Sequence, residues 1–309
     1  MTRAWRSFAG VLLLGAATAP GFAQDTEAQA PRSEFGVRYW LATGSTRRSH
    51  DASAFDPTLA NPTSTLTYSG LQANIGELYA RQAFGEDWHV KGNIGIGRIN
   101  NGTFTDQDFF FIGGAPFMTQ TVSSTDGKLG YVTVDVGREV WRRGGSAISV
   151  FAGFQEWNES VDGHGLSDSF GPFGLGTETL VIRNELTWRS LRMGAEFRGT
   201  HGRTTFRVEG ALVPYATYRN EDSHFLRQDA DDLGPVPNVI ATGHGWGGMI
   251  EAELRRRYPQ LWDVDLSVGY RYWQLDSTKG TQTQAGFELP IVDLRSVRHG
   301  VLFAVTKSW

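Results

Sequence analysis

The sequence predicts an all-β fold: a transmembrane antiparallel up-and-down β-barrel of about ten strands, with long extracellular loops and short periplasmic turns. Three observations predict it. Segments of alternating apolar and polar residues recur along the chain, and the connections between them alternate in length. The composition is also rich in glycine and aromatic residues, with 38 Gly, 10 Trp, 9 Tyr and 19 Phe among 309 residues. Aromatic rings collect at membrane–water interfaces, where barrels carry them as girdles.

The amino-terminal residues have the pattern of a signal peptide. Arg3 and Arg6 form a basic start, residues 8–17 form a short apolar stretch, and Gly21-Phe22-Ala23 offers small residues for cleavage. About 10 apolar residues are too few for a membrane-spanning helix, which needs roughly 20. We therefore predict a signal peptide over 1–23 and an outer-membrane β-barrel domain over 24–309. Export and a barrel together predict the outer membrane of a Gram-negative bacterium.

Charge and cysteine content exclude other classes of protein. The chain has no cysteine, so it forms neither disulfides nor thiolate metal sites. Its formal net charge is -4 with both signs interspersed, which gives no footprint for nucleic acid.

Three segments show the alternation most clearly. Valines at 132, 134, 136 and 140 alternate with polar or small residues, and so do the apolar residues of 264–272 and 301–309. The polar faces carry ionisable groups, which suits a polar lumen inside a lipid-facing wall. The chain ends on Trp309, which resembles the terminal aromatic residue of outer-membrane barrels. An ordinary edge strand that happens to be terminal is the alternative.

The predicted strands and turns follow from this pattern. The strands are 34–45, 63–84, 87–100, 128–142, 146–160, 178–198, 201–218, 243–258, 262–277 and 294–309. Short turns are expected at 85–86, 143–145, 199–200 and 259–261. Long connections rich in Gly, Asn, Asp, Ser and Pro are expected at 46–62, 101–127, 161–177, 219–242 and 278–293. Short turns on one rim and long loops on the other are typical of outer-membrane barrels.

Two of the long loops contain compact polar clusters. One holds Asp106-Gln107-Asp108-Phe109 and the other holds Asp222-Ser223-His224. Either cluster alone is more often a solvated turn than a site. Together they gain weight, because they follow the third and seventh strands, which are four apart in a ten-stranded barrel and face each other across a cleft.

This constellation resembles the omptin family of outer-membrane proteases. The family has ten-stranded barrels with Asp-Gln-Asp-aromatic after the third strand and Asp-x-His after the seventh. Gly153-Phe154-Gln155-Glu156 is similar to the family's Gly-Tyr-Gln-Glu on strand five. The resemblance extends over nearly the whole mature chain by strand order, loop spacing and scattered motifs.

The resemblance implies an endopeptidase with catalytic residues Asp106, Asp108, Asp222 and His224. In the family, an Asp/His dyad and an Asp pair flank the water that attacks the peptide bond. A histidine oriented by a carboxylate can accept a proton from water near neutral pH. Two neighbouring carboxylates repel, which raises the pKa of one of them. The resemblance implies no metal site and no cofactor. It makes lipopolysaccharide a candidate lipid activator.

The sequence departs from the family at the substrate pocket and at the lipid contact. Arg48 and Asn220 align with two acidic pocket residues that bind a basic substrate side chain in the family. We therefore expect cleavage beside neutral or acidic residues, or no cleavage of Arg-Arg peptides at all. On strand five the lipopolysaccharide-contacting trio reads Phe154, Glu156 and Asn158, so the aromatic and acidic residues are kept and the basic one is lost.

Two other functions are compatible with the pattern. The first is a non-catalytic barrel that acts as an adhesin or surface-binding protein, which Arg48 and Asn220 favour. The second is a narrow channel. Against a channel, we expect ion pairs to plug the lumen; the residues concerned are Arg207, Glu209, Asp265 and Arg271. The expected partners are outer-membrane lipid, lipopolysaccharide and a peptide or protein substrate at the extracellular face. We expect a monomer and no nucleic acid.

Overall fold

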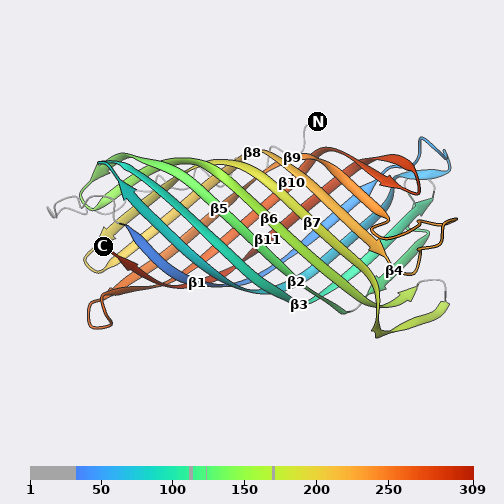
Figure 1. Cartoon of the computed structure of the whole chain (residues 1–309), viewed down its shortest axis with the longest axis horizontal. Helices are drawn as coiled ribbons and strands as arrows, with labels where there is room; N and C mark the ends of the chain where they lie inside the picture. The colour runs from blue at the N-terminus through green and yellow to red at the C-terminus, as the bar shows by residue number, and fades with distance from the viewer. Residues whose placement is uncertain (1–32, 111–113, 123, 169–170) are drawn as a thin grey trace.

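The computed structural model describes residues 33–110, 114–122, 124–168 and 171–309, and these residues form one closed antiparallel β-barrel (Figure 1). The predicted signal peptide and residues 24–32 lie outside the described residues. No helix within the described ranges is long and apolar enough to cross a membrane.

Eleven strands make up the sheet. Their bounds are β1 Glu34–His50, β2 Leu59–Phe84, β3 Trp88–Phe110, β4 Met118–Val122, β5 Ser124–Arg143, β6 Ser146–Asp168, β7 Gly171–His201, β8 Thr204–His224, β9 Val239–Tyr258, β10 Val264–Gln284 and β11 Phe287–Ser308.

The barrel wall has the predicted up-and-down topology. Each long strand pairs antiparallel with the next one along the chain, and β1 pairs with β11 over its whole length to close the ring. The short strand β4 lies between β3 and β6 at one end, so the other ten strands form the wall. Closure leaves no open edge, which a sheet in a lipid bilayer requires. The prediction of about ten strands is confirmed.

Alternation along each strand separates a lipid-facing exterior from a packed interior. Val132, Val134 and Val136 of β5 are exposed, whereas Tyr131, Thr133 and Asp135 between them are buried. Similar exposed apolar residues on the other wall strands complete a band around the barrel. On β3 this band runs from Trp88 to Ile96, and on β8 from Phe206 to Tyr215, and we take it as the membrane-spanning part.

The strands continue beyond the band, and here the predicted boundaries are wrong. Strand residues make up most of the expected loops at 101–127, 161–177 and 278–293 and part of those at 46–62 and 219–242: β3 continues to Phe110 and β8 to His224. Outside the membrane both faces of a strand meet water or polar neighbours, so the apolar alternation that marks a strand is lost although its ladder hydrogen bonds persist. The short strand β4 lies inside the expected loop 101–127. The expected loop 278–293 is reduced to a two-residue β10–β11 turn, Ala285-Gly286, in which both residues have positive φ.

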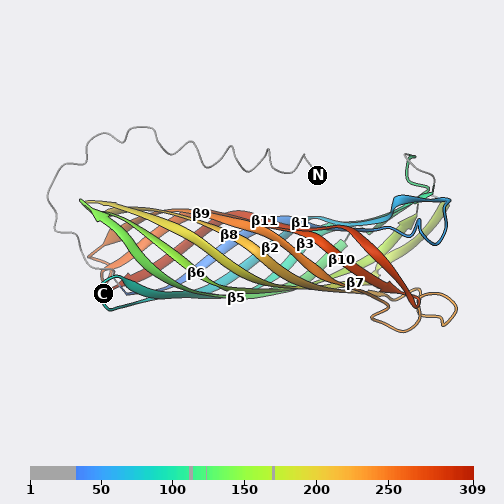
Figure 2. The same ribbon diagram turned by 90° about the horizontal axis from the view of Figure 1, so that it is seen from above.

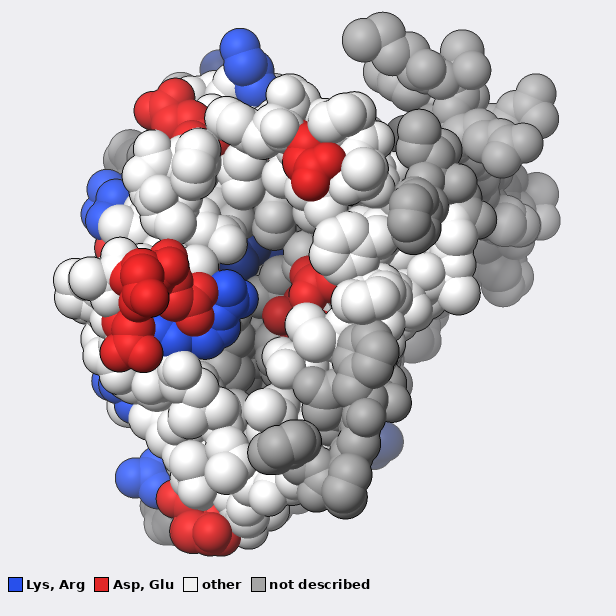
Figure 3. Space-filling view, turned by 90° about the vertical axis from the view of Figure 1, so that its right-hand side faces the viewer, with Lys and Arg blue, Asp and Glu red and all other residues white. Residues whose placement is uncertain are grey.

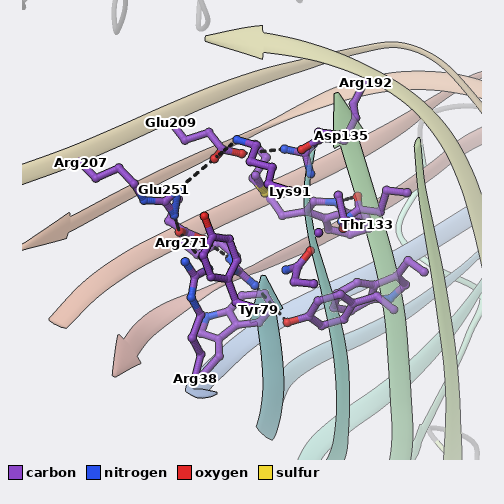
Figure 4. A pocket seen from close by; sticks show the side chains of 18 residues that line it. Arg38, Tyr79, Lys91, Thr133, Asp135, Arg192, Arg207, Glu209, Glu251 and Arg271 are labelled. Carbon is purple, nitrogen blue, oxygen red and sulfur yellow. Dashed lines mark hydrogen bonds and ion pairs between the residues drawn. The ribbon is translucent and has the colours of Figure 1, made fainter. Parts of the chain in front are cut away.

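Paired charges fill the lumen within the band, as Figure 4 shows. Arg207 contacts Glu209 at 3.0 Å and both Glu196 and Glu253 at 3.2 Å, and it also bonds Glu251. Arg271 bonds Glu251 at 2.6 Å and Glu77 at 2.8 Å. Asp265, which we expected in this plug, instead accepts a hydrogen bond from Ser308 at 3.3 Å.

An aromatic layer closes the lumen toward the end of the barrel at which β3 and β8 end. Trp157 stacks on Tyr131 at 5.1 Å and on Trp273 at 4.9 Å, and the Arg271 guanidinium lies 4.9 Å from the ring of Trp40. The cavity left between the charges and these rings measures about 30 Å³, room for roughly a water molecule or two. The lumen is packed, which argues against a channel.

The lumen pairs should stabilise the barrel, and their loss can be measured on gels. Arg207→Ala removes the cation from several buried carboxylates, which costs about 3–5 kcal/mol for a broken buried pair. A folded barrel that has not been boiled migrates differently on a gel from the unfolded chain. We expect the folded band of the variant to disappear at a lower temperature than that of the wild-type barrel. Arg203→Ala, in the exposed β7–β8 turn, is the matched control and should leave that temperature unchanged. Equal heat resistance of the two variants would contradict this role for the pairs.

Candidate functional site

The long-loop end of the barrel, which we call the mouth, is hollowed at its centre. Figure 3 looks into it and shows acidic and basic side chains gathered on the wall of the hollow. The β1–β2 connection and the end of β3 lie on one side, and the β8–β9 segment and the β10–β11 hairpin lie on the opposite side (Figure 2). The two predicted polar clusters are therefore on facing walls.

On one wall, Asp106 and Asp108 project inward from β3. They lie within the strand and not in a loop, so their spacing of two puts both carboxylates on the same face. The register pairs Asp108 with Ser64 and Asp106 with Leu66 of β2. The Ser64 hydroxyl donates a hydrogen bond to Asp106 Oδ1 at 3.1 Å.

This wall lies beyond the apolar band, and burial changes the acidity of both carboxyls. Burial, with a smaller contribution from the charge of Asp108, raises the pKa of Asp106 to about 7, against the lowering effect of the Ser64 hydrogen bond. Burial also raises the pKa of Asp108. Asp106 therefore holds a proton at mildly acidic pH. Burial is the main cause, and the repulsion between carboxylates that the sequence predicts adds a smaller part.

On the opposite wall, Asn220, Asp222 and His224 follow one another on the inward face of β8. Asp222 is fully buried, and the register sets it beside Asn184 of β7, whose side-chain amide donates to Asp222 Oδ1. The charge of Asp222 contributes to the raised pKa of Asp106, so the two walls are within electrostatic reach.

His224 is held mainly through its backbone. Its N–H donates to Asn238 Oδ1 at 3.0 Å, and Asn238 Nδ2 donates back to the His224 carbonyl at 3.2 Å. No hydrogen bond joins its ring to Asp222 among the described residues. Burial lowers the pKa of His224 to about 4; the charge of Asp222 opposes that shift and the charge of Arg48 adds to it. The imidazole is therefore neutral near pH 7.

Arg48 crosses the mouth from β1 to β8. Its Nη1 donates to Asn220 Oδ1 at 2.6 Å, and its Nη2 forms an ion pair with Asp222 Oδ2. The Arg48 side chain is 4% exposed. The structure thus brings together the two residues predicted to replace the acidic pocket pair, and it ties both to the predicted dyad.

Several neighbours of the site were not predicted. Asn184 and Asn238 position Asp222 and His224, and Ser64 positions Asp106. The Tyr68 hydroxyl is buried and has no hydrogen-bond partner among the described residues. Its burial, together with the charge of Asp222, raises its pKa well above 10. Single polar residues in alternating strands carry no signal of this role, because their partners are remote in sequence.

The predicted lipid-contact residues lie elsewhere, on the outer wall of β6. Phe154 is exposed, and Glu156 accepts hydrogen bonds from Arg189 at 2.9 Å and Asn158 at 3.1 Å. Asn158 also lines an outer groove of about 820 Å³. Arg98 and Lys128 line the same groove and are direct register partners on β3 and β5.

Comparison with known proteins identifies the fold. The solved structure of the outer membrane protease OmpT from Escherichia coli is similar with a TM-score of 0.71, covering 93% of this chain and 99% of that chain at 10% sequence identity. The translocator domain of the autotransporter NalP from Neisseria meningitidis covers 92% of this chain and 90% of its own at 9% identity, with a TM-score of 0.39 that is too low to support an argument. No family model and no curated protein matches the sequence. At 10% identity the likeness to OmpT establishes an outer-membrane type of barrel and leaves the activity open.

The raised pKa of Asp106 should be measurable directly. A titration of carboxyl ¹³C shifts in detergent micelles, assigned with Asp106→Asn, should show a pKa of about 7. Asp108→Asn should lower this pKa because it removes a neighbouring negative charge. Ser64→Ala should raise it, because the lost hydrogen bond stabilises the ionised form. A pKa near 4 for Asp106 in the wild-type protein would contradict the buried-pair description.

Proposed function

We propose that this barrel is an omptin-like endopeptidase of the outer membrane, which hydrolyses peptide bonds with an activated water at an extracellular mouth. One observation carries the proposal. The carboxylate pair Asp106/Asp108 and the pair Asp222/His224 project inward from facing walls of one hollowed mouth, above a closed lumen. The likeness in fold to OmpT supports the proposal, since that protein is a protease.

The chemistry needs a base for the water and an acid for the carbonyl oxygen. A neutral His224 accepts a proton as the water oxygen attacks the carbonyl carbon of the peptide bond. The proton that Asp106 keeps at acidic pH forms a hydrogen bond to the developing oxyanion. The C–N bond then breaks, the leaving amine takes the proton from His224, and the products are a carboxylic acid and an amine.

This division of roles predicts an acidic pH optimum. Activity should rise as the His224 imidazole loses its proton, at a pKa of about 4. It should fall as the Asp106 carboxyl loses its proton, because the pKa of Asp106 is about 7. The profile of kcat/KM against pH for a neutral peptide should therefore be bell-shaped between these limits. Activity that keeps increasing above pH 8 would refute a protonated carboxyl as the acid.

Substitutions can test the assigned catalytic set. His224→Ala should lower kcat by roughly 10²–10⁴-fold, the usual effect of losing a general base. Asp222→Ala should lower it as well, and the double variant should lose little more, since groups that act as a unit are not additive. Turnover of a mixed peptide library by the refolded barrel is the measurement, and chelator should have little effect.

The matched control is another Asp/His pair near the same end of the barrel. His164 Nε2 lies 3.1 Å from Asp126 Oδ1, on neighbouring strands β6 and β5. His164→Ala should leave turnover unchanged. If the folded wild-type protein cleaves no peptide, or if His224→Ala remains fully active, the results would favour a non-catalytic, surface-binding barrel over the endopeptidase. The ion pair that already engages Asp222 favours that alternative.

We also propose that lipopolysaccharide contacts the outer wall near Phe154 and Glu156. Arg98 and Lys128 support this, because like charges directly opposite on paired strands are unfavourable without an anion between them. They supply positive charge in the groove that Asn158 lines, where the sequence motif lacks its basic residue.

The lipid contact can be tested with purified lipopolysaccharide. Removing both cations in Arg98→Ala/Lys128→Ala should weaken its binding by roughly 10–30-fold, at about 1 kcal/mol for each charge near an anionic surface. Lys279→Ala, an exposed lysine on β10, is the control and should bind as the wild-type protein does. Equal affinities for all three proteins would argue against this groove.

A further inference from the structure

Arg48 has the contacts that a bound cation would have in the mouth. We infer that the Arg48 guanidinium fills a cation-binding subsite of the cleft, which Asn220 and Asp222 form. The cleft should then accept a neutral substrate side chain next to this subsite, and a basic side chain only when Arg48 is removed. The inference about peptides rests on the proposed endopeptidase, whereas the subsite itself can be tested by binding alone.

The subsite is formed by one carboxylate and one amide oxygen on β8. Asn220 Oδ1 accepts from Arg48 Nη1 at 2.6 Å, and Asp222 Oδ2 accepts from Nη2. Two parallel N–H donors facing two acceptors are how a guanidinium is recognised in any site, whether it is a ligand or a side chain. Arg48 reaches these acceptors from β1, on a different part of the barrel wall.

The acceptors are oriented by residues other than Arg48. Asn184 donates to the second oxygen of Asp222, and Asn220 Nδ2 donates to the Glu185 carbonyl at 3.1 Å, which turns its own Oδ1 toward the guanidinium. Asp222 and Asn220 are both almost fully buried. The subsite therefore keeps two aligned acceptors when Arg48 is absent.

Arg48 does not satisfy all its own donors there. Its Nε is buried and has no hydrogen-bond partner among the described atoms. Structural arginines of the lumen, such as Arg81 and Arg192, share this feature. The case for a subsite therefore rests on the two β8 acceptors, which residues other than Arg48 orient.

The Arg48–Asp222 ion pair restricts the expected substrate side chains from neutral or acidic ones to neutral ones only. A free Arg48 would repel basic side chains and attract acidic ones, but its charge is offset by Asp222 in direct contact. An acidic substrate side chain would have to compete with Asp222, and a basic one would find the acceptors taken. We therefore expect a preference for neutral side chains over both charged kinds.

The binding test uses methylguanidinium as the probe and thermal unfolding of the full barrel as the readout. Millimolar methylguanidinium should raise the unfolding temperature of Arg48→Ala and leave that of the wild-type protein unchanged. Adding Asp222→Asn to Arg48→Ala should abolish the effect, because the carboxylate is lost. Arg48→Gln, whose amide can still donate to Asp222, provides a second neutral variant if Arg48→Ala does not fold, and it should also respond, more weakly.

The peptide test compares matched substrates with Arg, Ala or Glu before the scissile bond. Wild-type protein should favour Ala over both. In Arg48→Ala, the Arg peptide should gain about 10–100-fold relative to the Ala peptide, the usual contribution of a hydrogen-bonded charge. Protection by methylguanidinium without any peptide cleavage would support the subsite and overturn the endopeptidase alone. No protection of either neutral variant, or strong wild-type selection for Arg or Glu, would overturn the inference.

Discussion

Closure of the sheet between β1 and β11 is the constraint on which the rest of the structure depends. A sheet in lipid cannot leave an edge unpaired, because each unsatisfied backbone group in hydrocarbon costs several kcal/mol. Pairing along the whole length of β1 therefore fixes the first strand relative to the last. It also sets Arg48, at the far end of β1, within reach of β8 through the interior.

Two layers of side chains fill the interior of the barrel, and together they close the passage between its two ends. Buried ion pairs such as those of Arg207 and Arg271 offset charges that could not otherwise leave water. The aromatic layer above them separates the lumen from the mouth. With the passage closed, ligands reach the polar groups of the mouth from one side only, so any chemistry belongs to that end of the barrel.

Within the mouth, the balance of charge decides the chemistry. Asp222 contacts Arg48 and Asn184. The Asp106/Asp108 pair forms no ion pair within the described part of the chain, and Asp106 keeps a proton at higher pH than an ordinary aspartate. His224 has a low pKa in the same surroundings. In the proposed mechanism the base and the acid therefore come from opposite walls of the cleft. The charge of Arg48 lowers the pKa of both His224 and Asp106.

The sequence by itself determined the barrel and the strand order, because period-two alternation marks the wall strands. It also set the clusters Asp106/Asp108 and Asp222/His224 opposite each other, because they follow strands four apart. It misjudged the strand ends outside the membrane, since both faces are polar there and alternation disappears. Only the tertiary structure decided that Arg48 pairs with Asp222, that Asn184 and Asn238 support the site, and that Asp265 stays outside the lumen pairs. Those contacts join strands far apart in sequence, and their register depends on closure of the whole ring.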